Sequence, residues 1–148
     1  MSEFVERIGM VAGNNFKSGF NCGEAIVETF RKECGVDIDD NAFRLCSGFG
    51  GGMGHAADVC GALVGCVMVI STLVGRNHPA EKPLKEIYPI SKEFHDRFAE
   101  AFGSTKCSDL MPYEFDTREH LKNCLKLTNK VAQLLATFLL EKGLIKEE

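Results

Sequence analysis

The 148-residue chain has no block of basic residues, and its formal net charge at pH 7 is −4. Proteins that bind nucleic acids usually carry a basic patch opposite the phosphates, so nucleic acid is not an expected partner. The N-terminus, MSEFVERIGM, carries acids and lacks the basic-then-apolar order of a secretory signal. We therefore expect a cytoplasmic protein in a reducing compartment, where clustered cysteines bind metals or react more often than they form structural disulfides.

Several local signatures of known sites are also missing. No two cysteines have the C-x-x-C spacing of thioredoxin-like proteins and zinc ribbons. No Gly-Lys-Ser/Thr sequence closes a phosphate-binding loop, and the acidic segment 36–40 lacks the ligand spacing and turn glycine of a calcium loop. Any metal site or disulfide would therefore join cysteines that the fold brings together from distant segments.

The sequence also lacks the alternation of apolar and polar residues that marks strands. Apolar residues recur instead with the period of a helix, and no repeat or linker divides the chain. This pattern predicts an all-α, single-domain bundle over residues 1–148, with five to seven helices.

Capping residues predict where the helices begin. Asn21 and Glu24 have the spacing of a capping box, which makes Cys22 the first residue of the second helix. Ser104 is expected to cap a short helix with Cys107 in its first turn. Other helices are expected over residues 2–13, 41–46, 82–102 with a break near Pro89, and 117–142.

A glycine-rich segment near the middle of the chain cannot form a regular helix, because each glycine costs about 1 kcal/mol relative to alanine. It can turn sharply or let another group approach the backbone closely. We therefore consider its five glycines as candidate cofactor-binding residues: Gly48, Gly50, Gly51, Gly52 and Gly54.

An apolar helix is expected to follow the glycines, over residues 59–74, with Asp58 as its N-cap. It is apolar nearly all round, which predicts a buried helix at the centre of the bundle. The run is slightly short for a membrane span, so we expect no membrane association. Gly61 and Gly65, four residues apart, predict that a neighbouring backbone approaches this helix closely.

Seven cysteines are present, an odd number that cannot all pair within one chain. Cys22, Cys60 and Cys107 each fall in the first turn of a predicted helix, where free amides and the helix dipole favour a thiolate. Cys124 falls on the core-facing stripe of the last helix. These four are the candidate catalytic and metal-ligating residues, whereas Cys34, Cys46 and Cys66 have no assigned role.

The cysteines are open to more than one interpretation. They could ligate an iron–sulfur cluster or zinc, exchange thiol and disulfide states, or pack as small buried hydrophobes. His55 could be a ligand, a proton donor or an exposed side chain. Gly52-x-Gly54-x-x-Ala57 matches a shortened dinucleotide fingerprint, but no strand is expected before it.

The pattern resembles a family of redox-active proteins named for its cysteines, C_GCAxxG_C_C. The residues that carry the resemblance extend from the second helix to the last: Cys22, the glycines 48–54, the hexapeptide Cys60-Gly61-Ala62-Leu63-Val64-Gly65, Cys107 and Cys124. The family label places glycine before cysteine in the hexapeptide, whereas here Cys60 precedes Gly61. The resemblance implies a redox role, with electron transfer to a partner oxidoreductase through a bound cluster or through the thiols.

The amount of apolar surface bears on how the chain assembles. Phe94, Phe98 and Phe102 form an apolar stripe, and the long last helix adds further apolar surface. One chain offers more apolar surface than one core requires, so we expect a homodimer with two-fold symmetry.

Overall fold

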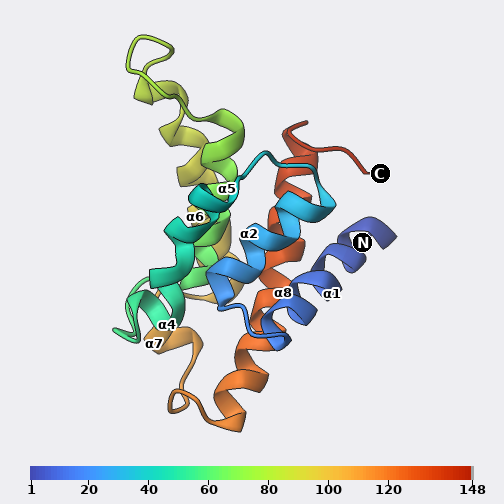
Figure 1. Ribbon diagram of the computed structural model, residues 1–148, viewed down its shortest axis with the longest axis vertical. Helices are drawn as coiled ribbons and strands as arrows, with labels where there is room; N and C mark the ends of the chain where they lie inside the picture. Colours follow the sequence, from blue (N-terminus) through green and yellow to red (C-terminus); the bar gives the residue numbers. More distant parts are fainter. Residues whose placement is uncertain (148) are drawn as a thin grey trace.

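The computed structural model describes residues 1–147, and that part of the chain is helical with no sheet (Figure 1). One isolated antiparallel bridge joins Val59 to Lys106. The predicted all-α fold is confirmed. The elements are α1 (Glu3–Lys17), α2 (Cys22–Glu33), α3 (Asp40–Phe43), η1 (Arg44–Phe49), α4 (Gly50–Met53), α5 (Gly61–Val74), η2 (Leu84–Glu86), α6 (Tyr88–Phe102), α7 (Cys107–Leu110) and α8 (Arg118–Glu141).

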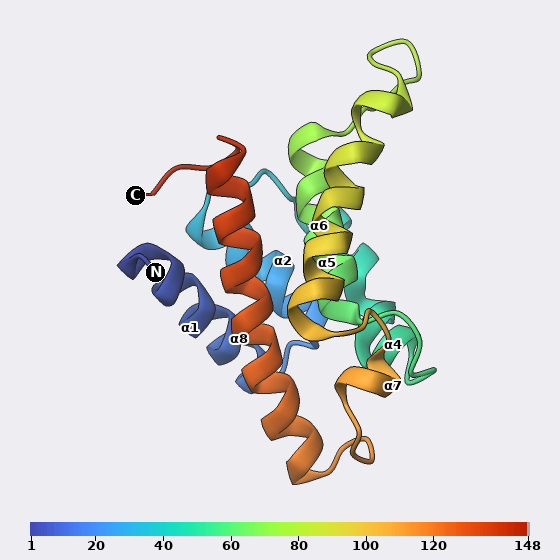
Figure 2. The same ribbon diagram turned by 180° about the vertical axis from the view of Figure 1, so that it is seen from behind.

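The long helices form two pairs with α2 between them. α5 packs with α6 on one side of the molecule, and α1 packs along α8 on the other (Figures 1 and 2). The core between them is built from buried side chains of α5, α6 and α8, including Ile70, Phe94, Phe98 and Phe138, none of which is exposed to solvent. No helix among the described residues is both long enough and apolar enough to cross a membrane.

α1 is longer than predicted, because it continues past Gly13 to Lys17. Gly13 lies on the face of α1 that packs against α8, and a β-carbon there would be 3.8 Å from atoms of Leu125 and Asn129. The glycine therefore lies inside a helix–helix contact. The prediction that it ends the helix was wrong.

The start of α5 also differs from the prediction. Cys60, and not Asp58, is the N-cap residue. Asp58 and Val59 are held extended, because the Cys60 amide donates to the Thr105 carbonyl at 2.8 Å and the Cys107 amide donates to the Asp58 carbonyl at 2.5 Å. Cys60 therefore precedes the first turn of α5 and is not part of it.

The segment predicted over residues 82–102 is divided close to Pro89, as expected: η2 ends at Glu86 and α6 begins at Tyr88. Pro89 lies in the first turn of α6, where no amide hydrogen bond is lost. α7 has Lys106 as its N-cap residue. The Ser104 hydroxyl accepts from the Lys106 amide at 3.0 Å and so orders the residues just before the helix.

Glycines bring α2 and α5 into close contact at the end where the cysteines lie. A β-carbon at Gly23 would be 2.9 Å from the Gly61 carbonyl oxygen, and one at Gly65 would be 2.7 Å from the Gly23 carbonyl oxygen. The close approach predicted from Gly61 and Gly65 is confirmed. Because no side chain separates the two backbones, Cys22 at the start of α2 comes beside the start of α5.

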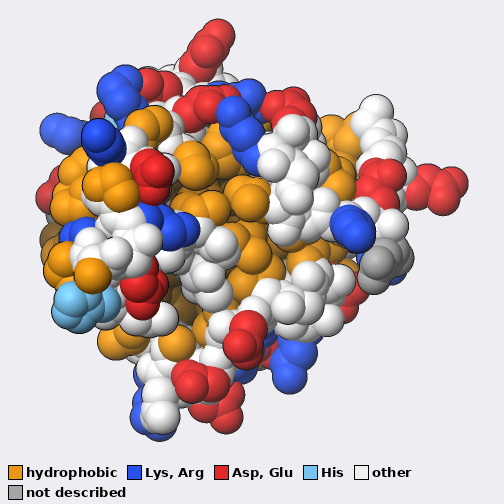
Figure 3. Space-filling model, turned by 90° about the horizontal axis from the view of Figure 1, so that it is seen from above, with side chains coloured by type: hydrophobic (Ala, Val, Ile, Leu, Met, Phe, Trp, Pro, Cys, Tyr) orange, Lys and Arg blue, Asp and Glu red, His pale blue; other side chains and the backbone are white. Residues whose placement is uncertain are grey.

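The surface has apolar areas as well. Seen from above, apolar side chains gather in the floor of a hollow whose rim carries charged side chains (Figure 3). A separate groove of about 520 Å³ runs along one side of α5, where Val64, Val67 and Met68 are half-buried. α5 is thus covered by neighbouring helices on most of its circumference and not on all of it.

Candidate functional site

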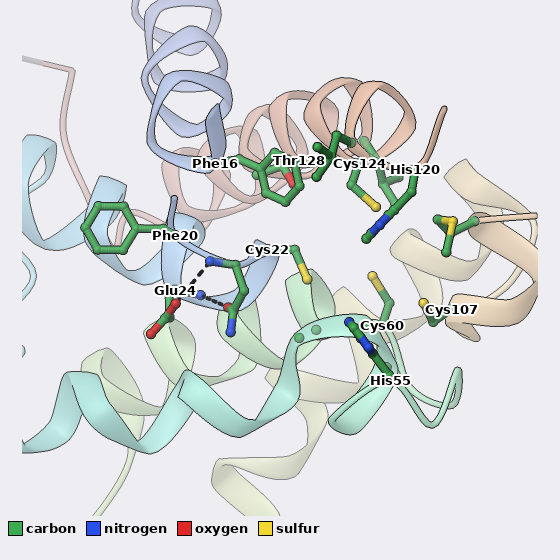
Figure 4. A pocket seen from close by; sticks show the side chains of 18 of the residues that line it. Phe16, Phe20, Cys22, Glu24, His55, Cys60, Cys107, His120, Cys124 and Thr128 are labelled. Atoms are coloured by element: carbon green, nitrogen blue, oxygen red, sulfur yellow. Dashed lines mark hydrogen bonds between the residues drawn. The ribbon is translucent and has the colours of Figure 1, made fainter. Parts of the chain in front are cut away.

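One cavity of about 690 Å³ lies where the starts of α2, α5 and α7 meet the N-terminal half of α8 (Figure 4). Cys22, Cys60, Cys107 and Cys124 all line it. The structure therefore brings together the four cysteines that the sequence singled out, from four separate segments. Cys34, Cys46 and Cys66 do not line this cavity.

Cys22 is positioned by the start of α2. The Asn21 side chain accepts from the Glu24 amide at 2.9 Å, and the Glu24 carboxylate accepts from the Asn21 amide at 3.0 Å. This confirms the predicted capping box. Asn21 also donates to the Ser47 carbonyl at 2.9 Å, which ties the helix start to the segment that carries the glycines.

Cys60 and Cys107 are positioned together by the short antiparallel pairing around Val59 and Lys106. Successive residues of an extended segment point to opposite sides. Cys60 and Cys107 each follow a bridged residue, so their side chains leave the pairing on the same side. Both thiols point into the cavity (Figure 4).

Cys124 comes from α8 together with two polar residues at intervals of four. His120, Cys124 and Thr128 form one stripe of the helix, and all three line the cavity. The prediction that Cys124 faces the packed core was wrong. Its side chain is half-buried and faces the cavity, because α8 extends beyond the helices that cover its C-terminal half.

The glycine segment forms one wall of the cavity, to which Gly48, Gly50, Gly51, Gly52 and Gly54 all contribute. Gly52 has a left-handed φ of 71°, and a β-carbon there would be 2.6 Å from Cβ of Cys107. Only glycine allows the backbone to pass this close to the Cys107 side chain. Gly48, in contrast, has no heavy atom within 4 Å of an added β-carbon, so no contact requires glycine there.

The backbone beside this wall is strained. Met53, His55 and Ala57 have φ values of 76°, 66° and 59°, although none of them is glycine. Left-handed conformations of such residues cost on the order of 1 kcal/mol or more each. The amide of Ala57 donates to the Gly51 carbonyl and the amide of Asp58 to the Gly52 carbonyl, both at 3.0 Å, and these bonds hold the loop in place.

Burial raises the pKa of all four cavity thiols. Loss of water raises the pKa of Cys22 to about 11, with a further increase from the neighbouring Cys60, while the amides of Gly51 and Gly23 act in the opposite direction. Burial raises the pKa of Cys124 to about 12, and the nearby Cys22 adds to this.

Cys60 behaves in the same way. Burial raises its pKa more than the amides of Ala62 and Leu63 lower it, although these amides belong to the first turn of α5. The neutral thiol makes no capping hydrogen bond to them. The prediction that helix amides make Cys60 easy to ionise was wrong, because desolvation outweighs them. Burial also raises the pKa of Cys107.

Two histidines flank the thiols. His55 stacks on Phe115 with ring centroids 4.1 Å apart, and the same Phe115 meets the His120 ring edge-on. His120, which was not predicted as a site residue, is buried, and its Nδ1 accepts from the Asp116 amide at 2.8 Å. Its position four residues before Cys124 on a predicted helix was the available signal.

The residues fit the two candidate metal groups differently. Among residues 1–147, no three His, Cys, Asp or Glu side chains lie close enough together to hold a single metal ion. A mononuclear zinc site therefore does not fit the cavity. Four cysteine thiols are the usual ligand set of an iron–sulfur cluster, which spreads its ligands over several iron atoms, so the donor chemistry fits a cluster.

Comparison with known proteins agrees with the cysteine arrangement. A family model described as "Putative redox-active protein (C_GCAxxG_C_C)" matches residues 20–138, a range that includes all four cavity cysteines. The chain belongs to this family. The family's description assigns its members a redox role.

One relative from Archaeoglobus fulgidus is described as an uncharacterized protein. It is 21% identical over 122 residues, which cover 77% of this chain and 81% of the relative. No solved structure matches the chain. The comparisons thus support membership of the redox-active family, and the relative's description adds no finer activity.

Proposed function

We propose that this protein is an electron-transfer protein whose cavity holds an iron–sulfur cluster through Cys22, Cys60, Cys107 and Cys124. The observation that carries the proposal is that these four thiols, from four distant segments, line one cavity. Packing of cysteine as a small hydrophobe does not require thiols to gather at a cavity, and the fully buried Cys66 illustrates the alternative.

Electrostatics supports a cationic occupant. Each ionised thiol disfavours ionisation of its neighbours, as Cys60 does for Cys22 and Cys22 does for Cys124. Several thiolates can share this buried space only if positive charge compensates them. Iron supplies that charge, and a coordinating thiol is deprotonated by the metal.

The chain's own residues would have three tasks. The cysteines bind, the glycine wall brings backbone amides such as that of Gly51 toward the sulfur of Cys22, and the helices around the cavity limit access of water. A cluster supplies storage of one electron. The protein would accept one electron from a reduced partner and donate it to an oxidised one, so we propose that it acts with a partner oxidoreductase. We also propose a cytoplasmic, reducing location.

A second candidate is thiol–disulfide exchange by Cys60 and Cys107. It is favoured by the antiparallel pairing, which directs both thiols to the same side. Formation of their disulfide would release two electrons and two protons, which a partner disulfide would take up to become two thiols. The raised pKa values of both thiols disfavour this candidate, because the thiolate is the reactive form. For a zinc-binding module, the other alternative, residues 1–147 contain no three suitably grouped ligands.

The test is anaerobic purification followed by visible absorption spectroscopy and assays for iron and acid-labile sulfide. We expect sulfur-to-iron absorption bands and iron in the wild type. Cys60→Ser should lose both while the circular dichroism spectrum persists. Cys66→Ser is the matched control, because Cys66 lies in the interior of α5, which Cys60 caps, and does not line the cavity.

A colourless wild type without iron would contradict the cluster. Titration of thiols before and after oxidation would then decide the second candidate: loss of two thiols in the wild type, and none in Cys107→Ser, would support it. Iron retained by Cys60→Ser and lost by Cys66→Ser would contradict the assignment of the cavity cysteines.

We also propose a homodimer, on a different basis from that suggested by the sequence. Phe94 and Phe98 are fully buried within one chain, so they offer no surface. The groove along α5 is lined mostly by apolar side chains, and Leu45, which lines it, is 67% exposed. A two-fold axis could place Leu45 of each copy in the groove of the other. Sedimentation at micromolar concentration should give a dimer for the wild type and a monomer for Leu45→Glu.

A further inference from the structure

The cavity contains a buried hydroxyl without a partner. Thr128 is fully buried, lines the cavity, and is the one residue among 1–147 whose buried side-chain oxygen has no hydrogen bond. A helical threonine can satisfy its hydroxyl by donating to the carbonyl four residues earlier. Thr29 on α2 does so, because its hydroxyl donates to the Ala25 carbonyl at 2.7 Å and accepts from Asn15 at 3.0 Å.

A second donor comes from His120, two turns before Thr128 on α8. Its Nδ1 accepts from the Asp116 amide, so the neutral ring carries its proton on Nε2. No described residue accepts from Nε2, and the ring points into the cavity between Cys124 and Cys60 (Figure 4). Thr128 and His120 thus present two donors, on either side of Cys124, to the same space.

Neither donor has a hydrogen-bond acceptor among residues 1–147, and the Thr128 hydroxyl is also fully buried. A buried donor without an acceptor costs free energy, and native proteins rarely leave one unsatisfied. Sulfur atoms of a cluster and of its thiolate ligands are anionic acceptors. We propose that Thr128 and His120 donate hydrogen bonds to the sulfur-ligated group held by the four cysteines and thereby raise its reduction potential. This inference rests on the proposed function.

The physical reason for the direction is charge. Reduction adds one negative charge to the group, and that charge is spread over iron and sulfur. A hydrogen bond to sulfur stabilises the more negative, reduced state more than the oxidised state. Removing a donor should therefore shift the potential to a more negative value without removing a ligand.

The experiment compares Thr128→Val and His120→Phe with Thr29→Val in the full chain, purified without oxygen. Thr29→Val is the matched control, because Thr29 is equally buried and does not line the cavity. We expect iron content like that of the wild type in all three variants. The midpoint potential should become more negative in the two cavity variants only, and the iron–sulfur stretching bands in resonance Raman spectra should shift with it.

A further readout does not depend on the bound group. Nitrogen-15 spectra of the histidine rings in iron-free protein should show His120 as the Nε2–H tautomer. Nδ1–H would overturn the role of His120.

Three outcomes of the potential measurement would also overturn the proposal. If the wild type contains no iron, both this inference and the proposed function fail. If iron is present and neither cavity variant changes the potential, only this inference fails. If Thr29→Val shifts the potential as much as Thr128→Val, loss of any buried hydroxyl produces the shift, and the assigned role of Thr128 is wrong. Should His120→Phe not fold, Thr128→Val decides alone, because valine has nearly the shape of threonine.

Discussion

Gly61 lies directly against the sulfur of Cys22: a β-carbon added at Gly61 would be 2.7 Å from Cys22 Sγ and 2.5 Å from the Phe49 carbonyl oxygen. The start of α5 therefore leaves room for Cys22 only because residue 61 has no side chain. This contact explains why a glycine follows Cys60, although glycine is a poor residue for the first turn of a helix. It joins the cysteine of α2 to the hexapeptide of α5.

Gly61→Ala should destabilise the protein and its site, even though alanine is a better helix former than glycine. The substitution favours the helix by about 1 kcal/mol. The clash with Cys22 and with the rigid Phe49 backbone should reverse this and give a net loss of about 1–3 kcal/mol. Urea denaturation measures the loss, and iron content should fall with it. Gly48→Ala is the control, since nothing lies near Gly48; equal behaviour of the two variants would contradict the packing argument.

The strained loop predicts a stabilising substitution. Ala57 has a φ of 59°, and glycine adopts this conformation without strain, so Ala57→Gly should raise the free energy of unfolding by about 1 kcal/mol. The neighbouring Ala56 is not among the residues with positive φ, so Ala56→Gly should lower it by roughly 0.5–1 kcal/mol. Thermal denaturation of both variants checks the pair. A loss of stability at both positions would contradict the strain.

The raised pKa values predict a loss of stability in alkali. The thiol of Cys22 has a pKa of about 11 in the folded protein, compared with 9.0 for an unperturbed thiol. Above pH 9 the unfolded chain loses this proton while the folded chain keeps it, so the stability of the iron-free, reduced protein should fall between about pH 9 and pH 11. Below pH 9 this thiol should contribute no pH dependence.

Urea denaturation at a series of pH values measures this effect. Cys22→Ser should make the alkaline slope smaller without abolishing it, because the pKa values of Cys60, Cys107 and Cys124 are raised as well. Lys126→Gln, an exposed substitution on α8 that removes no thiol, should leave the slope unchanged. Iodoacetamide should also label the cavity thiols of native protein more slowly at pH 8 than it labels the unfolded chain. Rapid labelling of Cys60 at pH 7 would contradict the raised pKa of its thiol. It would instead support the reactive thiolate that the sequence predicted.

The parts of the fold that could be predicted are those fixed by local chemistry. The period of apolar residues indicated helices, and the spacing of Asn21 and Glu24 indicated a capping box that the structure contains. Family resemblance and helix-start placement together selected the four cysteines that line the cavity. In each case a short segment carries enough information without its neighbours.

The predictions that were wrong concern features that depend on contacts between distant segments. The N-cap of α5 is Cys60 and not the predicted Asp58, because residues 58–60 pair with residues 105–107, which are more than forty positions away. The pKa of Cys60 depends on burial by other helices, and local dipole arguments give the wrong sign. Gly13 looked like a helix terminus and instead packs against α8. His120 and Thr128 have no motif of their own, since only the meeting of α8 with the cysteine segments gives them a role.

The two buried threonines provide a final prediction about stability. In iron-free protein the Thr128 hydroxyl has no hydrogen-bond partner among residues 1–147. Thr128→Val therefore removes an unsatisfied hydroxyl, adds an apolar methyl group and should leave the free energy of unfolding unchanged or higher. Thr29→Val breaks the bonds of its hydroxyl to Ala25 and Asn15 and should cost about 1–3 kcal/mol. Urea denaturation of the two variants after removal of iron by a chelator compares them directly. A cost at Thr128 as large as that at Thr29 would mean that its hydroxyl is already bonded within the empty cavity, and it would then be unavailable to the group that the cysteines hold.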